Sequence, residues 1–175
     1  PARARERLAQ FPAELQHHPV LESVRRQIEA TERSAVGQPY MDLALKNTAG
    51  EAIALSSLVG TGRWVLLDFW ATWCGPCCRE IPHLKKAYEA LRGRGFEIYA
   101  VSIDSDAACW KRFVAENGLA WTNVISEGGG KASPAAAMYG IRFIPSNFLI
   151  APDGTIAAKN VSGRLLQERL EKLMK

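Results

Sequence analysis

Hydrophobic and polar positions follow a helical period in the first part of the chain and change to mixed patterns afterwards. Within residues 1–36, apolar side chains recur at helical spacing, at Leu21, Val24 and Ile28. Pro19 fits the first turn of a helix that we expect to end near Ser34. No strand pattern precedes Gly37, so the sequence predicts a helical linker segment over residues 1–36 and a separate domain over residues 37–175. A partner-binding helix is the alternative interpretation of the first segment.

The remainder of the chain alternates between strand and helix patterns. Residues 42–55 alternate around a Thr-Ala-Gly turn, which predicts a β-hairpin. Further strands are expected at residues 63–70, 96–104 and 121–126, and helices at residues 77–95, 105–118 and 133–140. A second hairpin over residues 146–160, with a Pro-Asp-Gly turn, and an amphipathic helix over residues 163–175 follow. Strands that alternate with helices before a closing hairpin indicate an α/β fold around a mixed sheet.

Composition and charge exclude several classes of protein. The chain is 47% hydrophobic and 23% charged, which is typical of a globular protein. The net charge of +4 is mild, and no run of like charge or aromatic–basic patch indicates binding of nucleic acid. The longest apolar runs are too short to span a bilayer. Because the chain starts at Pro1, we expect a processed or truncated product, in which a missing signal peptide says nothing about the compartment.

Three of the four cysteines lie in "WATWCGPCCRE", residues 70–80. A structural zinc site needs four ligands, and the one histidine near this motif, His83, lies on a helix that would carry it away. A disulfide within Cys-x-x-Cys closes too small a loop to constrain the unfolded chain much. A Cys-x-x-Cys between a buried strand and a helix of an α/β chain therefore favours a redox centre.

The position of the motif assigns different roles to its cysteines. Cys74 is expected where a strand ends and a helix begins, so free backbone N–H groups and the helix dipole favour its thiolate. We expect Cys74 to be the exposed nucleophile and Cys77, one turn later, its buried disulfide partner. Gly75 allows a tight turn beside a partner chain, and Pro76 suits the first helical turn.

Asp68 is a second candidate for chemistry. It interrupts the apolar run Val65–Trp70, six residues before Cys74. Burial would raise its pKa, and a carboxyl group that titrates near neutral pH can accept the proton of Cys77. An aspartate on a solvated strand face, or one that caps a local amide, is the alternative.

These residues carry a family resemblance. "LLDFWATWCGPC", followed some seventy positions later by "IRFIPSNFLI", resembles the thioredoxin superfamily, and most closely the TlpA/ResA-like branch of bacterial thiol–disulfide oxidoreductases. "AVGQPYMDLAL" and "IPSNFLIAPDGTI" match that branch in order and spacing, and the resemblance covers about residues 35–175. It implies a thioredoxin-like fold with an N-terminal β-hairpin and a βα insertion at about residues 104–126, here preceded by a helical segment.

The resemblance also implies roles for individual residues. The Ile144–Pro145 bond would be cis and would pack against the cysteine pair, with the preceding backbone free to pair with a bound partner peptide. Glu80 in "REIP" matches a family acid near the active site, and Asp68 matches the buried aspartate of thioredoxins. The implied substrate-binding residues are Trp73, Gly75, Pro76, Ile144 and Pro145.

The resemblance implies a thiol–disulfide oxidoreductase that exchanges its dithiol with protein substrates. The Cys74–Cys77 disulfide would serve in place of a cofactor, and an upstream redox partner would reduce it again to the dithiol. The Gly75–Pro76 pair matches the reducing thioredoxins, which favours a reductase. Members of the branch usually act in the periplasm or cell envelope, often with a membrane tether, which here would lie outside these residues.

Two other functions remain open, and so do the roles of two further cysteines. A Cys pair can bind Cu(I), as in a metal chaperone, although no neighbouring His or Met supplies a third ligand. A peroxiredoxin-like peroxidase would have Thr where Ala71 stands. We interpret Cys78 as a bystander thiol, with a second resolving thiol as the alternative, and Cys109 as a small packing residue.

Overall fold

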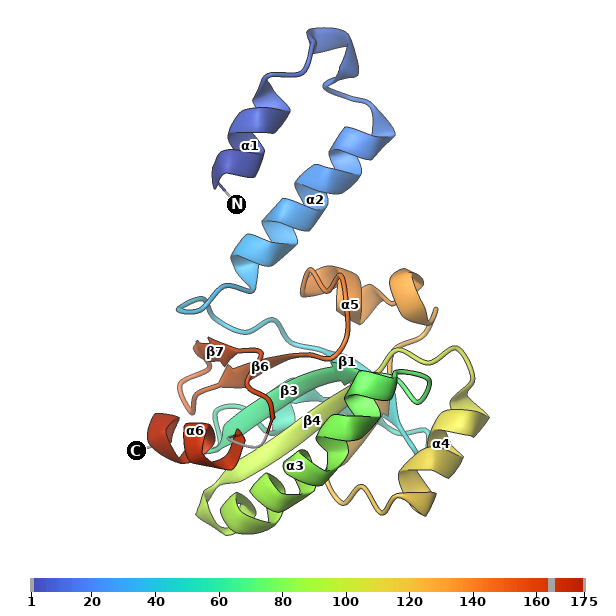
Figure 1. The fold of residues 1–175 in the computed structure, drawn as a ribbon, viewed down its shortest axis with the longest axis vertical. Helices are drawn as coiled ribbons and strands as arrows, with labels where there is room; N and C mark the ends of the chain where they lie inside the picture. The colour runs from blue at the N-terminus through green and yellow to red at the C-terminus, as the bar shows by residue number, and fades with distance from the viewer. Residues whose placement is uncertain (1, 164–165, 175) are drawn as a thin grey trace.

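One mixed β-sheet organises the structure, a computed structural model that describes residues 2–163 and 166–174 (Figure 1). The strands of this part are β1 (Ala44–Asn47), β2 (Ala52–Ala54), β3 (Trp64–Trp70), β4 (Phe96–Ser102), β5 (Thr122–Ile125), β6 (Ser146–Ile150) and β7 (Ile156–Lys159). The α-helices are α1 (Ala2–Ala9), α2 (Pro19–Arg33), α3 (Gly75–Leu91), α4 (Ala107–Glu116), α5 (Pro134–Met138) and α6 (Leu166–Leu173). The predicted strands and helices are thereby confirmed, except that α1 was missed and parts of the terminal helix prediction lie outside the described residues.

The strand order is β2-β1-β5-β4-β3-β6-β7, with β4 at the centre and β3 next to it. β3 runs parallel to β4 and antiparallel to β6. The inserted unit of α4 and β5 adds a strand parallel to β4, and β5 pairs in turn with β1 of the first hairpin. Consequently β3, which leads into the cysteine motif, has a paired strand on each side.

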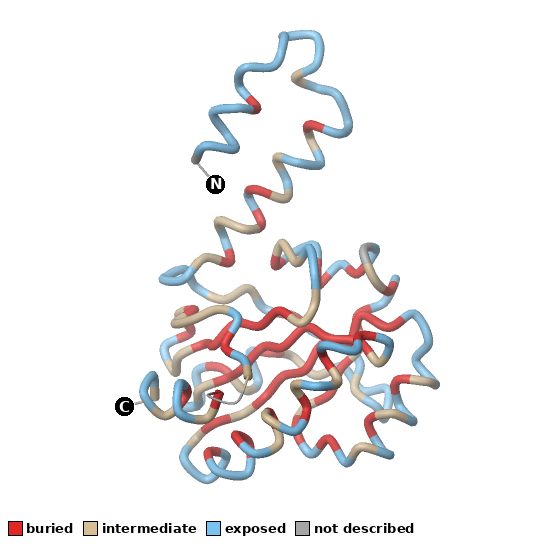
Figure 2. Tube along the Cα trace, viewed as in Figure 1, coloured by how far each residue is buried: buried red, intermediate tan, exposed pale blue. Residues whose placement is uncertain are grey.

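Apolar side chains cover both faces of the central strands, and the buried segments gather there in Figure 2. Six of the seven residues are buried in β3 and again in β4, as expected for parallel strands with helices on both faces. α3 packs beside α6, and its apolar stripe of Ile81, Leu84, Tyr88 and Leu91 is buried in the core. Packing against the sheet and α6 therefore holds the start of α3 in a fixed position.

The N-terminal segment forms a helical hairpin with a small apolar cluster of its own, made of Leu8, Leu21 and Ile28. Arg5 on α1 and Glu32 on α2 form an ion pair across it. The end of α2 contacts the sheet domain, since Ser34 Oγ donates to the carbonyl oxygen of Tyr139 at 3.0 Å. The boundary near residue 36 stays a prediction. Within residues 2–163 and 166–174, no helix combines the length and apolar character needed to cross a membrane.

Candidate active site

The cysteine motif lies where β3 ends and α3 begins. Cys74 is the N-cap of α3, and its sulfur accepts a hydrogen bond from the backbone N–H of Cys77 at 3.2 Å. A disulfide joins Cys74 to Cys77, with 5.2 Å between their Cα atoms. Pro76 stands in the first turn of the helix, where its missing N–H leaves no hydrogen bond unmade. The predicted position of Cys74 at the start of a helix is confirmed.

The expectation of an exposed Cys74 is wrong for this state of the protein. Cys74 is 6% exposed and Cys77 is 3% exposed, so both belong to the buried core. Cys74 is covered because its sulfur is bonded to Cys77 and faces the first turn of α3. Its neighbour Trp73 is 62% exposed and marks the solvent-facing rim of the motif.

Asp68 lies inside β3, between Ala100 of β4 and Asn147 of β6. It is buried, and the loss of solvation raises the pKa of its carboxyl group from 3.8 to about 7. A hydrogen bond with the Asn147 side chain acts in the opposite direction, and the negative charge of Glu80 raises the pKa further. The prediction that Asp68 is buried with a raised pKa is confirmed, and the solvated alternative is wrong.

A small cavity connects Asp68 with the cysteine pair. Asp68, Trp70, Cys77 and Trp121 are among the residues that line it, and its volume is about 10 Å³. The indole Nε1 atoms of Trp70 and Trp121 are buried and have no hydrogen-bond partner among the described residues. A cavity of this size, with polar groups in its wall, accommodates about one water molecule. Asp68 and Cys77 thus line the same small cavity.

Glu80 lies one turn beyond Cys77 on α3 and is half-buried. Its Oε2 accepts a hydrogen bond from the backbone N–H of Gly163 at 2.8 Å, which links α3 to the segment before α6. Its charge acts on Asp68. The structure therefore brings both predicted acids to the inner side of the cysteine motif, although a catalytic role for Glu80 stays a prediction.

The Ile144–Pro145 peptide bond is cis, as the resemblance implied. Ser146, the next residue, lies opposite Phe69 of β3, so the two residues sit at the end of β3 that leads to Cys74. Ile144 and Pro145 are half-buried, and Phe143 before them is 68% exposed. On the cysteine motif, Gly75 and Pro76 are exposed beside Trp73. The role of these residues in substrate binding stays a prediction.

The residue that positions the loop before Cys74 was not predicted from the sequence. Asp104, which is buried at the end of β4, accepts hydrogen bonds from the Thr72 backbone N–H at 3.1 Å and from its hydroxyl at 2.7 Å. It also accepts a hydrogen bond from the Ser102 hydroxyl at 2.6 Å. The only sequence signal is an acid directly after the apolar strand "FEIYAVSI". Asp104 thereby fixes the loop two residues before the nucleophile.

The other cysteines are free thiols and both are half-buried. Cys78 donates to the carbonyl oxygen of Thr72 at 3.5 Å, on the same loop. Cys109 lies on α4 beside Trp110, which takes the fully buried position, so Cys109 itself packs only in part. Among residues 2–163 and 166–174, no three His, Cys, Asp or Glu side chains gather as they would around a metal ion.

Comparisons with known proteins agree with this geometry. The family model described as "AhpC/TSA family" matches residues 36–159. The thiol-disulfide oxidoreductase ResA of Halalkalibacterium halodurans is 35% identical over 138 residues, which cover 79% of this chain and 74% of that protein. ResA of Bacillus subtilis is 30% identical over 138 residues, which cover 79% of this chain and 73% of that protein.

Solved structures support the fold. The thioredoxin domain of a thiol-disulfide oxidoreductase from Bacteroides vulgatus superposes with a TM-score of 0.73 at 30% identity, over 81% of this chain and 99% of that domain. The predicted thioredoxin-like fold is confirmed, including the hairpin before β3 and the inserted unit of α4 and β5.

Proposed function

This chain belongs to the AhpC/TSA family and is a thiol–disulfide oxidoreductase, and we propose that it reduces disulfide bonds of protein substrates through Cys74 and Cys77. The observation that carries this proposal is the Cys74–Cys77 disulfide at the N-terminus of α3, with the buried acid Asp68 behind it. Such a pair alternates between dithiol and disulfide, so it exchanges two electrons and needs no other group for that step.

The reaction begins with both cysteines reduced. The Cys74 thiolate, favoured by the N–H groups and dipole at the start of α3, attacks one sulfur of the substrate disulfide. That bond breaks, one substrate thiolate leaves, and a mixed disulfide joins Cys74 to the other substrate cysteine. Trp73, Gly75 and Pro76 form the exposed rim over which the substrate approaches.

The second step releases the product. The Cys77 thiol loses its proton to the Asp68 carboxylate, either directly or through one water in the shared cavity. The Cys77 thiolate then attacks the Cys74 sulfur, the substrate leaves as its second thiolate, and the Cys74–Cys77 disulfide forms. The substrate is reduced by two electrons and the protein is oxidised by two. A carboxyl group with a pKa of about 7 suits this proton transfer, since it gains and loses a proton readily near neutral pH.

Two other residues and a redox partner support this cycle. Glu80 contributes negative charge that makes Asp68 more basic. The backbone of Ile144, next to Pro145, pairs with an extended segment of the substrate by strand addition. An upstream redox partner restores the dithiol after each turnover. The resemblance to a branch whose members usually act in the periplasm or cell envelope supports that location for both reactions.

Insulin reduction tests the proposal. With dithiothreitol as reductant, the protein is expected to accelerate the precipitation of insulin, whereas Cys74→Ser abolishes the acceleration. Cys109→Ser is the matched control and is expected to retain activity, because Cys109 lies on α4 outside the motif. Full activity of Cys74→Ser would refute the mechanism, and rapid consumption of hydrogen peroxide without insulin reduction would favour the peroxidase.

The direction of electron flow is tested by the reduction potential of the Cys74–Cys77 pair. A value near about −270 mV supports a reductase, and a value near about −120 mV supports an oxidase.

A further inference from the structure

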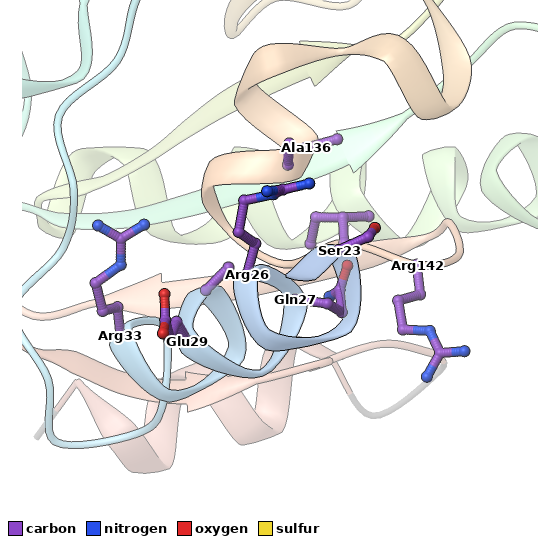
Figure 3. Close-up of a pocket in the computed structure, with 10 residues that line it drawn as sticks. Ser23, Arg26, Gln27, Glu29, Arg33, Ala136 and Arg142 are labelled. Atoms are coloured by element: carbon purple, nitrogen blue, oxygen red, sulfur yellow. The ribbon is translucent and has the colours of Figure 1, made fainter. Parts of the chain in front are cut away.

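A hollow of about 620 Å³ lies between α2 of the N-terminal segment and α5 of the sheet domain. Figure 3 shows the residues that line it. From α2 come Ser23, Arg26, Gln27, Glu29 and Arg33, and Arg142 lies on the segment between α5 and β6. The size is that of a site for several residues of a peptide or for a small ligand. We call this hollow the α2–α5 groove.

The α2–α5 groove is positively charged. Its ionisable lining consists of Arg26, Arg33 and Arg142 against the single acid Glu29. All three arginines are exposed, and none forms an ion pair or a side-chain hydrogen bond among the described residues. Arginine guanidinium groups that have no partner in the protein are suited to bind carboxylates in two-point hydrogen bonds.

The spacing of two arginines matches an extended peptide. Arg26 and Arg33 are seven residues apart, so they lie on the same side of α2, about 10 Å apart along its axis. Figure 3 shows Arg26 extending from α2 toward Ala136 of α5, with Arg33 further along the helix. In an extended polyproline II segment, with three residues per turn, side chains three residues apart lie on the same face, about 9 Å from each other. An extended segment of this kind with an acid at every third position therefore meets both guanidinium groups.

Close packing makes the α2–α5 groove a fixed part of the fold. Gln27 Nε2 donates to the carbonyl oxygen of Gly140 at 2.7 Å. A Cβ atom on Gly140 would lie 2.9 Å from the backbone nitrogen of Thr31, so α2 approaches the Gly140 backbone as closely as a glycine permits. The two walls thus keep their separation through direct contact rather than through the linker alone.

The groove leads toward the cis-proline segment. Ile141 and Arg142 line the α2–α5 groove and also a second hollow of about 190 Å³, which is bordered by Phe143 and Ser146. Phe143 and Ser146 flank Ile144 and Pro145, so a chain that pairs with Ile144 can continue past Arg142 into the groove. Lys159 lies in the second hollow and adds another positive charge along this path.

We propose that the α2–α5 groove binds an acidic, extended segment of the protein substrate whose disulfide reacts at Cys74. This proposal rests on the proposed function, because it assigns part of the same substrate to a second surface. The family match starts at residue 36, so the groove depends on a helix outside the matched region. A membrane surface is less suitable than a peptide, because the groove is concave and only two or three arginines reach any one ligand in it.

Peptide disulfides of different charge test the proposal. Each substrate is a symmetric disulfide of two identical peptides, so attack at either sulfur releases one peptide thiol, and closure of Cys74–Cys77 releases the second. Each peptide carries the block Glu-Ser-Ser-Glu-Ser-Ser-Glu, or the same block with Gln or Lys in place of Glu. The block stands either before or after the cysteine. The released thiol is measured in single turnovers of the reduced protein, and the block position that gives the larger ratio of Glu to Gln rate constants is used.

The readout is the ratio of second-order rate constants for the Glu and Gln peptides, because a general loss of activity cancels in it. At low ionic strength we expect a ratio of about ten, which decreases as salt screens the charges. The variant Arg26→Ser/Arg33→Ser should reduce the ratio to about one. The control Arg63→Ser/Arg92→Ser, which removes the same charge far from the groove, should keep it.

Three results would overturn the groove proposal. They are a ratio near one in the unmodified protein, an unchanged ratio in the Arg26→Ser/Arg33→Ser variant, and equal rates for Glu and Lys peptides. If the same two arginines instead control cosedimentation with phosphatidylserine vesicles while the ratio is near one, the surface binds membranes. If the Gln peptide is reduced normally in these cases, the proposed function stands. If no peptide is reduced, the proposed function fails, and the groove proposal fails with it.

Discussion

Replacement of Asp68 by Asn should change stability in a way that depends strongly on pH. The carboxyl group of Asp68 has its pKa raised from 3.8 to about 7 by burial, and its burial in the core makes solvent screening small. Between these two values the folded protein binds a proton at Asp68 that the unfolded chain does not bind. The free energy of unfolding therefore falls as pH rises, by about 1.4 kcal/mol per pH unit.

The size of this change in stability follows from the interval between the two pKa values of Asp68. The difference between about 7 and 3.8 is roughly three pH units, so ionisation of Asp68 costs the folded state about 4 kcal/mol above pH 7. The penalty is absent below pH 3.8 and is fully present above pH 7. Since Asn has a similar shape and does not ionise, Asp68→Asn should match the native protein at pH 4 and exceed its stability by up to about 4 kcal/mol at pH 8.

Urea unfolding of the oxidised protein between pH 4 and pH 8 measures this difference. Ser57→Ala, an exposed substitution that alters no ionisable group, is the control, and its effect should be the same at every pH. In the same Asp68→Asn variant, the release of the second substrate thiol should slow at neutral pH. A stability difference that stays constant from pH 4 to pH 8 would refute the raised pKa, and an unchanged pH–rate profile would remove Asp68 from the mechanism.

Three further substitutions test the surroundings of the site. Asp104→Ala leaves the Thr72 N–H and the Ser102 hydroxyl without their acceptor. The free energy of unfolding in urea should therefore fall by about 2 kcal/mol, and insulin reduction should slow. Normal values for both would contradict the positioning role. Gly140→Ala should destabilise the protein more than Gly60→Ala, since both glycines have positive φ but only Gly140 touches α2. Cys78→Ser should retain insulin reduction, and a loss of turnover would make Cys78 a resolving thiol.

Local patterns in the sequence were sufficient to predict most of the fold. The apolar run that contains Asp68 predicted a buried strand, and Pro76 with Gly75 predicted the start of α3, because both depend on neighbours in sequence. The helix α1 was missed because its residues are mostly exposed and polar, and Leu8 is buried only by contact with α2. Its helical state depends on tertiary packing that no short pattern records.

The residues of the site likewise fall into those that the sequence alone could identify and those that it could not. Cys74, Cys77 and Asp68 could be identified because a thiol pair at a helix start and an acid in an apolar strand are unusual in sequence. Asp104 was not predicted because its partner, Thr72, is 32 residues away in the sequence and contacts it only through the pairing of β3 with β4. The low exposure of Cys74 was likewise missed, because it depends on the disulfide that closes against the first turn of α3.

Trapping of the mixed disulfide tests the central claim most directly. In reduced Cys77→Ser the second step is blocked, so incubation with insulin should accumulate a covalent complex. Peptide mapping by mass spectrometry should find an insulin cysteine joined to Cys74, and Cys74→Ser/Cys77→Ser should form no complex. An insulin cysteine attached to Cys78 or Cys109, or no complex in Cys77→Ser, would contradict the assignment of Cys74 as the nucleophile that reduces protein disulfides.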